Sequence, residues 1–175
     1  MTELVPPPDI ARVFERAGWR PGRRVVDLPP SSAAHPAAQI LVSFAGLVLY
    51  PDADAGVDCA PSDIRFGPVE LRAPLVSEWA GRMAVTLVPV AEVHFSNDVL
   101  LVATDGRCFG FGYVDSAFFF LGHTLWEAAS RLLQGSRAMP MLLPWESAVQ
   151  LYGQVFTHES PNLYVPSTHA TEKPR

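Results

Sequence analysis

The chain has 175 residues, of which 49% are hydrophobic and 18% charged, and this composition is typical of one globular domain. It carries 18 acidic and 13 basic residues, and its one lysine is Lys173. Phosphate binding depends mainly on lysine and arginine, so the net charge of −5 argues against a nucleic-acid-binding surface. The same acidic balance would suit a basic partner.

The number of cysteines and the hydropathy of the chain indicate where in the cell the protein is located. Cys59 and Cys108 are too few for a disulfide framework and do not form a CxxC pair, which favours a reducing cytoplasm. Residues 1–8 lack the basic and apolar regions of a signal peptide. The apolar run from Ile40 to Tyr50 is too short to cross a bilayer. We therefore expect a cytoplasmic protein that does not bind membranes.

Two helices are predicted in the first third of the chain, each ended by a glycine. Asp9 is a favourable N-cap residue for a helix with apolar residues at helical spacing, and Gly18 ends it. A second helix is expected from Pro36 to Gly46, because proline is favoured in the first turn of a helix and glycine just after its end.

The elements predicted between residues 47 and 83 are shorter. Leu47 to Tyr50 predicts a strand, and Pro51 to Ser62, rich in proline, aspartate, alanine and glycine, predicts a solvated loop. Ile64 to Val69 predicts an edge strand because Gly67-Pro68 interrupts it. Ser77 to Met83 predicts a short helix.

A β-meander followed by a capped helix is predicted between residues 84 and 135. The expected strands are Ala91–Ser96, Val99–Thr104, Arg107–Tyr113 and Ala117–Leu121. Asn97-Asp98 marks the first turn, and Asp105-Gly106 supplies the positive φ of a type I′ hairpin turn. Thr124 with Glu127 matches a capping box, and Gly135 stands where a left-handed C-cap is expected.

The end of the chain has a weaker pattern. Prolines interrupt it before a possible helix that carries Leu151, and residues 158–175 are expected to form a mobile tail. Residues 1–157 therefore predict a single α+β domain. Its sheet should be mostly antiparallel, contain the β-meander, and be flanked by helices that pack against one side.

Two patterns that suggest chemistry are better explained by structure. The aspartates between residues 52 and 58 resemble a calcium loop, but the loop glycine and the expected glutamate are out of place. Cys108 with His94 or His123 would suggest a nucleophile and its base, yet a cysteine within a predicted strand is expected to be buried. We therefore predict a protein that is not an enzyme, with no catalytic residue, metal site or cofactor.

Phe118, Phe119 and Phe120 are consecutive, so in an extended strand their rings point to both faces of the sheet. Either both faces are covered, or one ring, with Phe119 as the candidate, is an exposed anchor for a partner. Gly110 and Gly112 lie in the preceding strand, where glycine indicates a bend or a close neighbour.

Residues 17–23, with the sequence AGWRPGR, resemble the AGW-x-PGR signature of the third family in the SUKH superfamily of bacterial immunity proteins. Other fragments follow in the same order as in that family, at Phe44–Leu47, Leu87–Ala91, Leu100–Arg107 and Leu121–Gly135. The resemblance covers residues 5–135. It departs from the family pattern at Ala91, where glycine is expected.

The resemblance implies a SUKH-like immunity domain of a polymorphic toxin system. Such a domain binds a cognate protein toxin inside the producing cell and blocks its activity, and these toxins are often nucleases or nucleic-acid deaminases. No catalytic residue is implied. The alternative is a regulatory or scaffold binding module of the same fold, similar to the cell-wall signalling relatives within the superfamily.

Two groups of residues are candidate contacts with such a partner. Asp52, Asp54, Asp58 and Asp63 would complement a basic active-site cleft on the toxin and speed encounter, or would simply belong to a solvated loop. Arg23, in the signature, is either a structural residue near the turn or a residue of the partner-binding surface.

Overall fold

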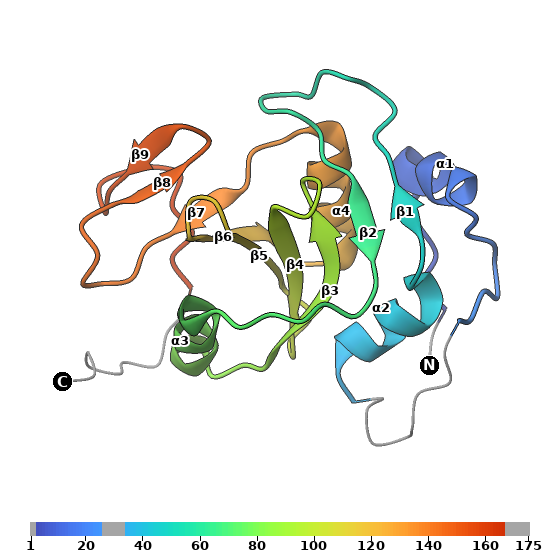
Figure 1. The fold of residues 1–175 in the computed structure, drawn as a ribbon, viewed down its shortest axis with the longest axis horizontal. Coiled ribbons are helices and arrows are strands. Elements are labelled where there is room, and N and C mark those ends of the chain that lie inside the picture. Colours follow the sequence, from blue (N-terminus) through green and yellow to red (C-terminus); the bar gives the residue numbers. More distant parts are fainter. Residues whose placement is uncertain (1–2, 26–33, 167–175) are drawn as a thin grey trace.

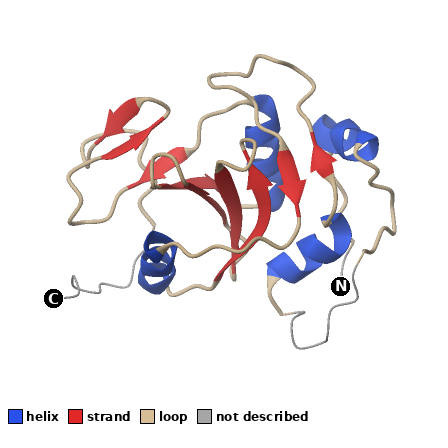
Figure 2. Cartoon of the chain, in the orientation of Figure 1, coloured by secondary structure: helices blue, strands red, loops and turns tan. Residues whose placement is uncertain are grey.

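The computed structural model describes residues 3–25 and 34–166, and its centre is a seven-stranded antiparallel sheet whose strand order follows the sequence (Figure 1). The strands are β1 (Val48–Leu49), β2 (Ile64–Phe66), β3 (Leu87–Val93), β4 (Asp98–Ala103), β5 (Cys108–Gly112), β6 (Ala117–Gly122) and β7 (Met139–Met141). The helices are α1 (Pro8–Arg16), α2 (Pro36–Phe44), α3 (Pro74–Met83) and α4 (Leu125–Gln134). The predicted α+β class with an antiparallel meander is confirmed (Figure 2).

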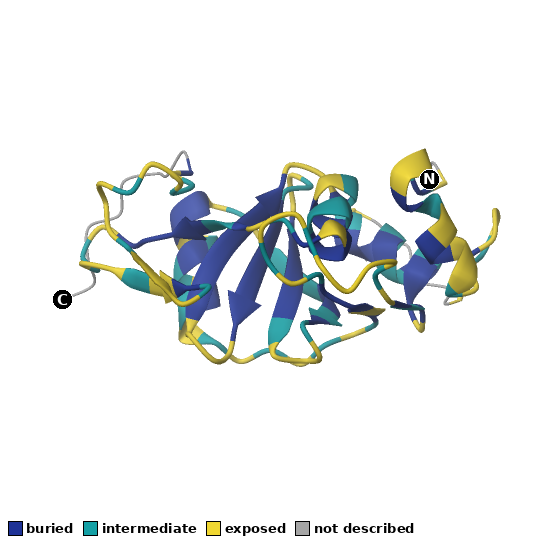
Figure 3. Cartoon of the chain, turned by 90° about the horizontal axis from the view of Figure 1, so that it is seen from above, coloured by how far each residue is buried: buried dark blue, intermediate teal, exposed yellow. Residues whose placement is uncertain are grey.

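Both faces of the sheet are covered, which differs from the predicted one-sided packing. Helices α1, α2 and α4, together with Leu151, contribute to one apolar core. Helix α3, together with Met141, Leu143 and Tyr164, contributes to a second core on the other face. The rings of Phe118 and Phe120 lie in the second core, and Phe119 lies in the first. Every residue of β5 and β6 is buried (Figure 3). Continuous apolar strands require this two-sided cover.

Strand β2 is an inner strand, so the prediction of an edge strand is wrong. It pairs with β1 through Ile64 and Arg65 and with β3 through all three of its residues. The strand ends at Phe66, before Gly67-Pro68. The proline therefore lies outside the ladder and removes no hydrogen bond from it.

Four of the five predicted helices exist in the described residues, and two of them begin earlier than predicted. Helix α1 begins at Pro8 and has no side-chain cap, so Asp9 lies in its first turn instead of capping it. Helix α3 begins at Pro74, three residues before the predicted start. The prediction for α4 is confirmed at both ends, because the Thr124 hydroxyl accepts a hydrogen bond from the Glu127 amide and Gly135 has a φ of 64°.

The turn between β3 and β4 is longer than predicted. Val93 pairs with Asp98, so residues 94–97 form the turn and Asp98 already belongs to β4. His94, Phe95 and Ser96 have φ values of 50°, 55° and 66°. Three consecutive non-glycine residues in the left-handed region are rare, because each places its Cβ against the following carbonyl oxygen.

The C-terminal region contains a hairpin where a helix was predicted. Strands β8 (Val149–Leu151) and β9 (Gln154–Phe156) pair around Tyr152 and Gly153, which have φ values of 54° and 68°. Positive φ at both central positions is typical of a type I′ hairpin turn and is incompatible with a helix.

The segment that follows is packed on the sheet as far as residue 166, which differs from the predicted mobile tail. The ring of Tyr164 stacks on Phe120 with 3.9 Å between centroids, and its amide donates to the Pro140 carbonyl at 2.9 Å. The physical reason is the exposed second face of the sheet, which this segment covers. The remainder of the predicted tail lies outside the described residues.

Gly110 admits a close neighbour, as the sequence indicated. It pairs with Phe119 across β5 and β6, and a Cβ atom at Gly110 would lie 2.0 Å from Cε2 of the Phe119 ring. The ring therefore occupies the space that any other side chain at position 110 would need.

Gly110→Ala is expected to lower the free energy of unfolding by about 1 to 3 kcal/mol, because the methyl group must displace a buried ring. Urea denaturation measures the change. Gly81→Ala is the matched control, since nothing lies within 4 Å of a Cβ at that helical position. The control should raise the free energy of unfolding by about 0.5 to 1 kcal/mol. Equal effects of the two substitutions would contradict this account.

Candidate partner-binding surface

The loop between β1 and β2 closes the C-terminal end of α4. Backbone amides of residues 57–59 and 62 donate to the carbonyl oxygens of residues 132, 134 and 135 at 2.8 to 3.0 Å. The last carbonyl groups of a helix have no partner within the helix, so the loop satisfies groups that would otherwise need water. The solvated loop predicted from composition therefore has a defined conformation.

Two glycines allow the loop to approach the helix this closely. A Cβ atom at Gly56 would lie 2.6 Å from the Cα of Gly135 and 2.2 Å from the carbonyl oxygen of Cys59. Neither position tolerates a side chain without movement of the backbone. The exposed residues of the loop are consequently held in place by main-chain contacts on both sides.

Three of the four predicted aspartates lie on the exposed part of this loop. Asp52 forms an ion pair with Arg16 of α1, and the carboxylate of Asp58 accepts a hydrogen bond from the Arg137 amide. Asp54 is exposed and has no hydrogen bond or ion pair to any residue of the described ranges. The first two carboxylates fix the loop to its neighbours, and Asp54 projects freely.

Asp63 differs from the other three because it is buried, with 3% of its surface exposed. Its Oδ1 atom accepts a hydrogen bond of 2.8 Å from the backbone amide of Phe95. A carboxylate in this position supports the turn between β3 and β4. It has no surface with which to contact a partner in this structure.

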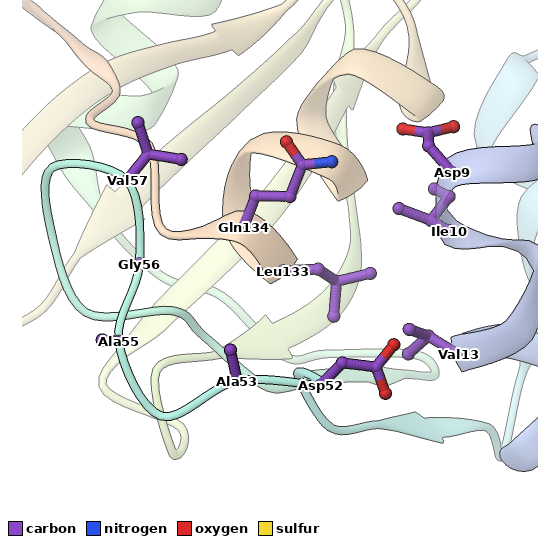
Figure 4. A pocket seen from close by; sticks show the side chains of 10 residues that line it. All are labelled: Asp9, Ile10, Val13, Asp52, Ala53, Ala55, Gly56, Val57, Leu133 and Gln134. Atoms are coloured by element: carbon purple, nitrogen blue, oxygen red, sulfur yellow. The ribbon is translucent and has the colours of Figure 1, made fainter.

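A groove of about 400 Å³ lies between α1, the loop and the end of α4 (Figure 4). Its lining residues are Asp9, Ile10, Val13, Asp52, Ala53, Ala55, Gly56, Val57, Leu133 and Gln134. Asp9 and Asp52 place carboxylates at its sides, and the carboxylate of Asp52 is paired with Arg16. Apolar side chains and negative charge together suit the stem and head of an arginine or lysine.

Arg23 closes the end of a different helix. Its Nη1 atom donates to the Ser43 carbonyl at 2.7 Å, and its Nη2 atom donates to the Ala45 carbonyl at 2.9 Å. Burial lowers the pKa of Arg23 from its ordinary value. The side chain therefore has a structural task at the end of α2, as one of the two sequence-based interpretations expected.

The rest of the signature positions this arginine. Trp19 is buried in the core, and its amide donates to the Phe14 carbonyl at 2.9 Å beyond the end of α1. Gly22 has a φ of 77°, and the Arg23 amide donates to the Arg20 carbonyl at 3.1 Å, which together with Pro21 makes a type II turn. The signature thus connects the end of α1 to the end of α2.

Cys108 and the histidines do not form a nucleophilic site. Cys108 is fully buried, and burial is the main cause that raises the pKa of its thiol to about 12. The imidazole of His94 instead lies 2.6 Å from the carboxylate of Asp98. A thiol with this pKa carries almost no thiolate near neutral pH, so it lacks the nucleophile that covalent catalysis needs.

The described ranges, residues 3–25 and 34–166, contain neither a metal-binding cluster nor a membrane-spanning helix. No group of three or more histidine, cysteine, aspartate or glutamate residues in these ranges is placed to hold a metal ion. No helix there combines the length and apolar character needed to cross a bilayer.

Two surface residues are not predicted by the sequence. Asp9 is predicted to cap a helix, but it lies beside the groove and accepts a hydrogen bond from Ser130 at 3.0 Å. Phe95 is predicted to lie in a strand, but it lies in a turn and 76% of its surface is exposed. A strand through residue 96 would place Phe95 on the same face as Ala91 and Val93, which are buried. Nothing in the local sequence indicates the left-handed turn that ends the strand at Val93.

Comparison with known families decides the classification. Residues 6–135 match the model of the SUKH-3 immunity protein family. The chain belongs to the SUKH-3 immunity protein family. No curated protein and no solved structure matches the chain. The SUKH-3 match extends from the start of α1 to the end of α4, so β7, β8 and β9 lie beyond it.

Substitution of Arg23 tests whether this residue of the SUKH-3 signature stabilises the fold or contacts the partner. Arg23→Ala should lower the free energy of unfolding by about 1.5 to 3 kcal/mol, because two charge-assisted hydrogen bonds to helix carbonyls are lost. Arg23→Lys should restore only part of the lost stability, because a single ammonium group replaces the two donor nitrogens of the guanidinium group. Urea denaturation gives the values.

Arg24→Ala is the matched control for this substitution. Arg24 is exposed and forms no hydrogen bond or ion pair with the described part of the chain, so its loss should change stability by less than about 0.5 kcal/mol. An Arg23→Ala protein of unchanged stability that binds its partner more weakly would place Arg23 on the partner-binding surface instead.

Proposed function

We propose that this chain is the immunity protein of a bacterial polymorphic toxin system, which binds a cognate protein toxin and blocks its activity by covering the active site. Membership of the SUKH-3 family supports an immunity-protein role. The observation that carries the proposal further is the acidic groove between α1, the loop of residues 51–62 and the end of α4. Hydrogen bonds between the loop and the end of α4 hold the backbone that carries the acidic residues.

The charge of this surface indicates the class of toxin. Nucleases and nucleic-acid deaminases bind a phosphate backbone, so their active-site clefts are lined by lysine and arginine. Asp9 and Asp54 lie at or beside the groove and supply the opposite charge, whereas the charge of Asp52 is balanced by Arg16. Complementary potentials increase the rate of encounter and disfavour wrong partners. We therefore infer a basic, nucleic-acid-directed toxin.

The proposed action is binding without catalysis. The buried thiol of Cys108 is poorly suited to act as a nucleophile, and occlusion needs no chemical step. Neutralisation of a toxin in the cytoplasm of its producer calls for a dissociation constant near 1 nM, which corresponds to about −12 kcal/mol. An interface of roughly 1,600 Å² with a few well-packed anchors can supply this affinity.

Co-expression with the product of the adjoining toxin-like gene tests the proposal. We expect the chain to restore growth of cells that produce the toxin and to form a stoichiometric complex with it. The complex is measured by affinity capture and size-exclusion chromatography. Neither rescue nor complex formation would contradict the proposal and would favour the regulatory or scaffold alternative.

We name residues 51–62 the acidic loop, and reversal of the charge of Asp54 tests its role in binding. Asp54→Lys should slow association with the toxin several-fold and weaken the dependence of the association rate on salt, because a charge at the rim of an interface acts mainly on encounter. Stopped-flow fluorescence measures the rate.

Glu70→Lys provides the matched control for Asp54→Lys. Glu70 is exposed, undergoes the same change of charge, and follows β2 at the opposite end of the sheet from the acidic loop. Equal slowing by both substitutions would show that only net charge matters and that the loop has no special part in the encounter.

A further inference from the structure

Two neighbouring turns display apolar side chains at one end of the sheet. Phe95, in the turn of residues 94–97, is 76% exposed, and Tyr113 and Val114, in the turn of residues 113–116, are 46% and 77% exposed. The turns adjoin because Asp98 pairs with Gly112. We name residues 94–97 and 113–116 the sheet-end surface, which Figure 1 shows where the β3–β4 and β5–β6 hairpins turn.

A main-chain hydrogen bond joins the two turns directly. The amide of Tyr113 donates to the carbonyl oxygen of Asn97 at 2.9 Å. The sheet-end surface is therefore one continuous structure of two hairpins, and its three exposed apolar residues lie on adjoining turns. Exposed large apolar residues are unremarkable singly, but a group of them marks a site of interaction.

Two buried side chains, Ser62 and Asp63, hold the backbone around Phe95 in an unfavourable conformation. His94, Phe95 and Ser96 are all left-handed. The hydroxyl of Ser62 accepts a hydrogen bond from the His94 amide, and the carboxylate of Asp63 accepts one from the Phe95 amide, both at 2.8 Å. Both acceptor residues are buried.

This arrangement fixes the direction of the Phe95 side chain. A turn rich in glycine or asparagine would reverse the chain with less strain, so the observed turn persists only because buried acceptors hold it. With its amide bound to Asp63, Phe95 is directed toward solvent and away from the core. The bulky apolar side chain is thus presented on a rigid support, as an interface anchor requires.

Three carboxylates lie on or beside the two turns. Glu92 accepts a hydrogen bond from the Ser96 hydroxyl at 2.7 Å, Asp98 lies against His94, and Asp115 is exposed within the second turn. Protein interfaces commonly have an aromatic centre and a polar rim. The acidic rim selects a basic partner by charge complementarity.

We propose that the sheet-end surface is the central contact with the toxin and that the ring of Phe95 inserts into an apolar recess beside the toxin's basic cleft. This inference rests on the proposed function and names the anchor that the acidic loop alone does not supply. Ser62 and Asp63 connect the two regions, because they end the acidic loop and support the Phe95 turn.

The test measures binding to the product of the adjoining toxin-like gene, carrying a substitution that removes its catalytic activity. Isothermal titration calorimetry with the full chain gives the dissociation constant. Phe95→Ala should raise it at least 30-fold, since aromatic anchors dominate interface energetics. Val114→Ser should raise it several-fold.

The control for both substitutions is Val155→Ser. Val155 is 67% exposed on β9, in the separate two-stranded sheet, so it offers similar apolar exposure away from the sheet-end surface. Its dissociation constant should equal that of the unmodified chain. Melting temperatures of all three variants should also stay unchanged, which separates lost contact from lost folding.

Each other result overturns the proposal in a recognisable way. If the unmodified chain binds the toxin and Phe95→Ala binds it equally well, the contact lies elsewhere while the proposed function stands. If the unmodified chain does not bind, the proposed function fails and the sheet-end proposal fails with it. If sedimentation shows a dimer that Phe95→Ala dissociates, the sheet-end surface joins two copies of this chain.

Discussion

Burial of β4, β5 and β6 on both faces is the constraint on which the rest of the structure depends. Three consecutive phenylalanines in β6 cannot all point to one side, so two apolar cores must form around one sheet. Helices α1, α2 and α4 supply one cover, and α3 with the C-terminal segment supplies the other. Gly110 is part of the same solution, because the ring of Phe119 lies where its side chain would be.

Helix ends in this fold are completed by distant segments. Arg23 binds the last carbonyls of α2, and the loop of residues 51–62 binds those of α4. In each case, hydrogen bonds to the carbonyl groups at the end of a helix hold a surface segment in one conformation. The conformation of the acidic loop therefore depends on its hydrogen bonds to the end of α4 as well as on its own sequence. Asp54 is exposed on this loop.

Local patterns predicted the architecture better than the surface. Capping of α4 and the glycine ends of the helices follow from residue chemistry at short range. The hairpin at Asp105-Gly106 exists, but the predicted type I′ turn is wrong, because Gly106 has a φ of 89° and Asp105 does not have a positive φ. The turn lies one residue earlier, where the Gly106 amide donates to the Ala103 carbonyl at 2.9 Å. Phe119 was a candidate anchor and is buried, whereas Phe95 was assigned to a strand and is exposed. Exposure of either ring depends on contacts between remote segments, such as that of Asp63 with the Phe95 amide, which spacing does not encode.

The packing of Tyr164 on Phe120 has a consequence for synthesis of the chain. A ribosome completes the region matched to the family when it reaches residue 135, yet at that point nothing from β7 onward covers the second face of the sheet. Trp79 of α3 is already available to cover Phe118, but Phe120 lacks its cover until Tyr164 emerges. Premature termination in this interval would yield an aggregation-prone fragment, although every residue of the signature would be present.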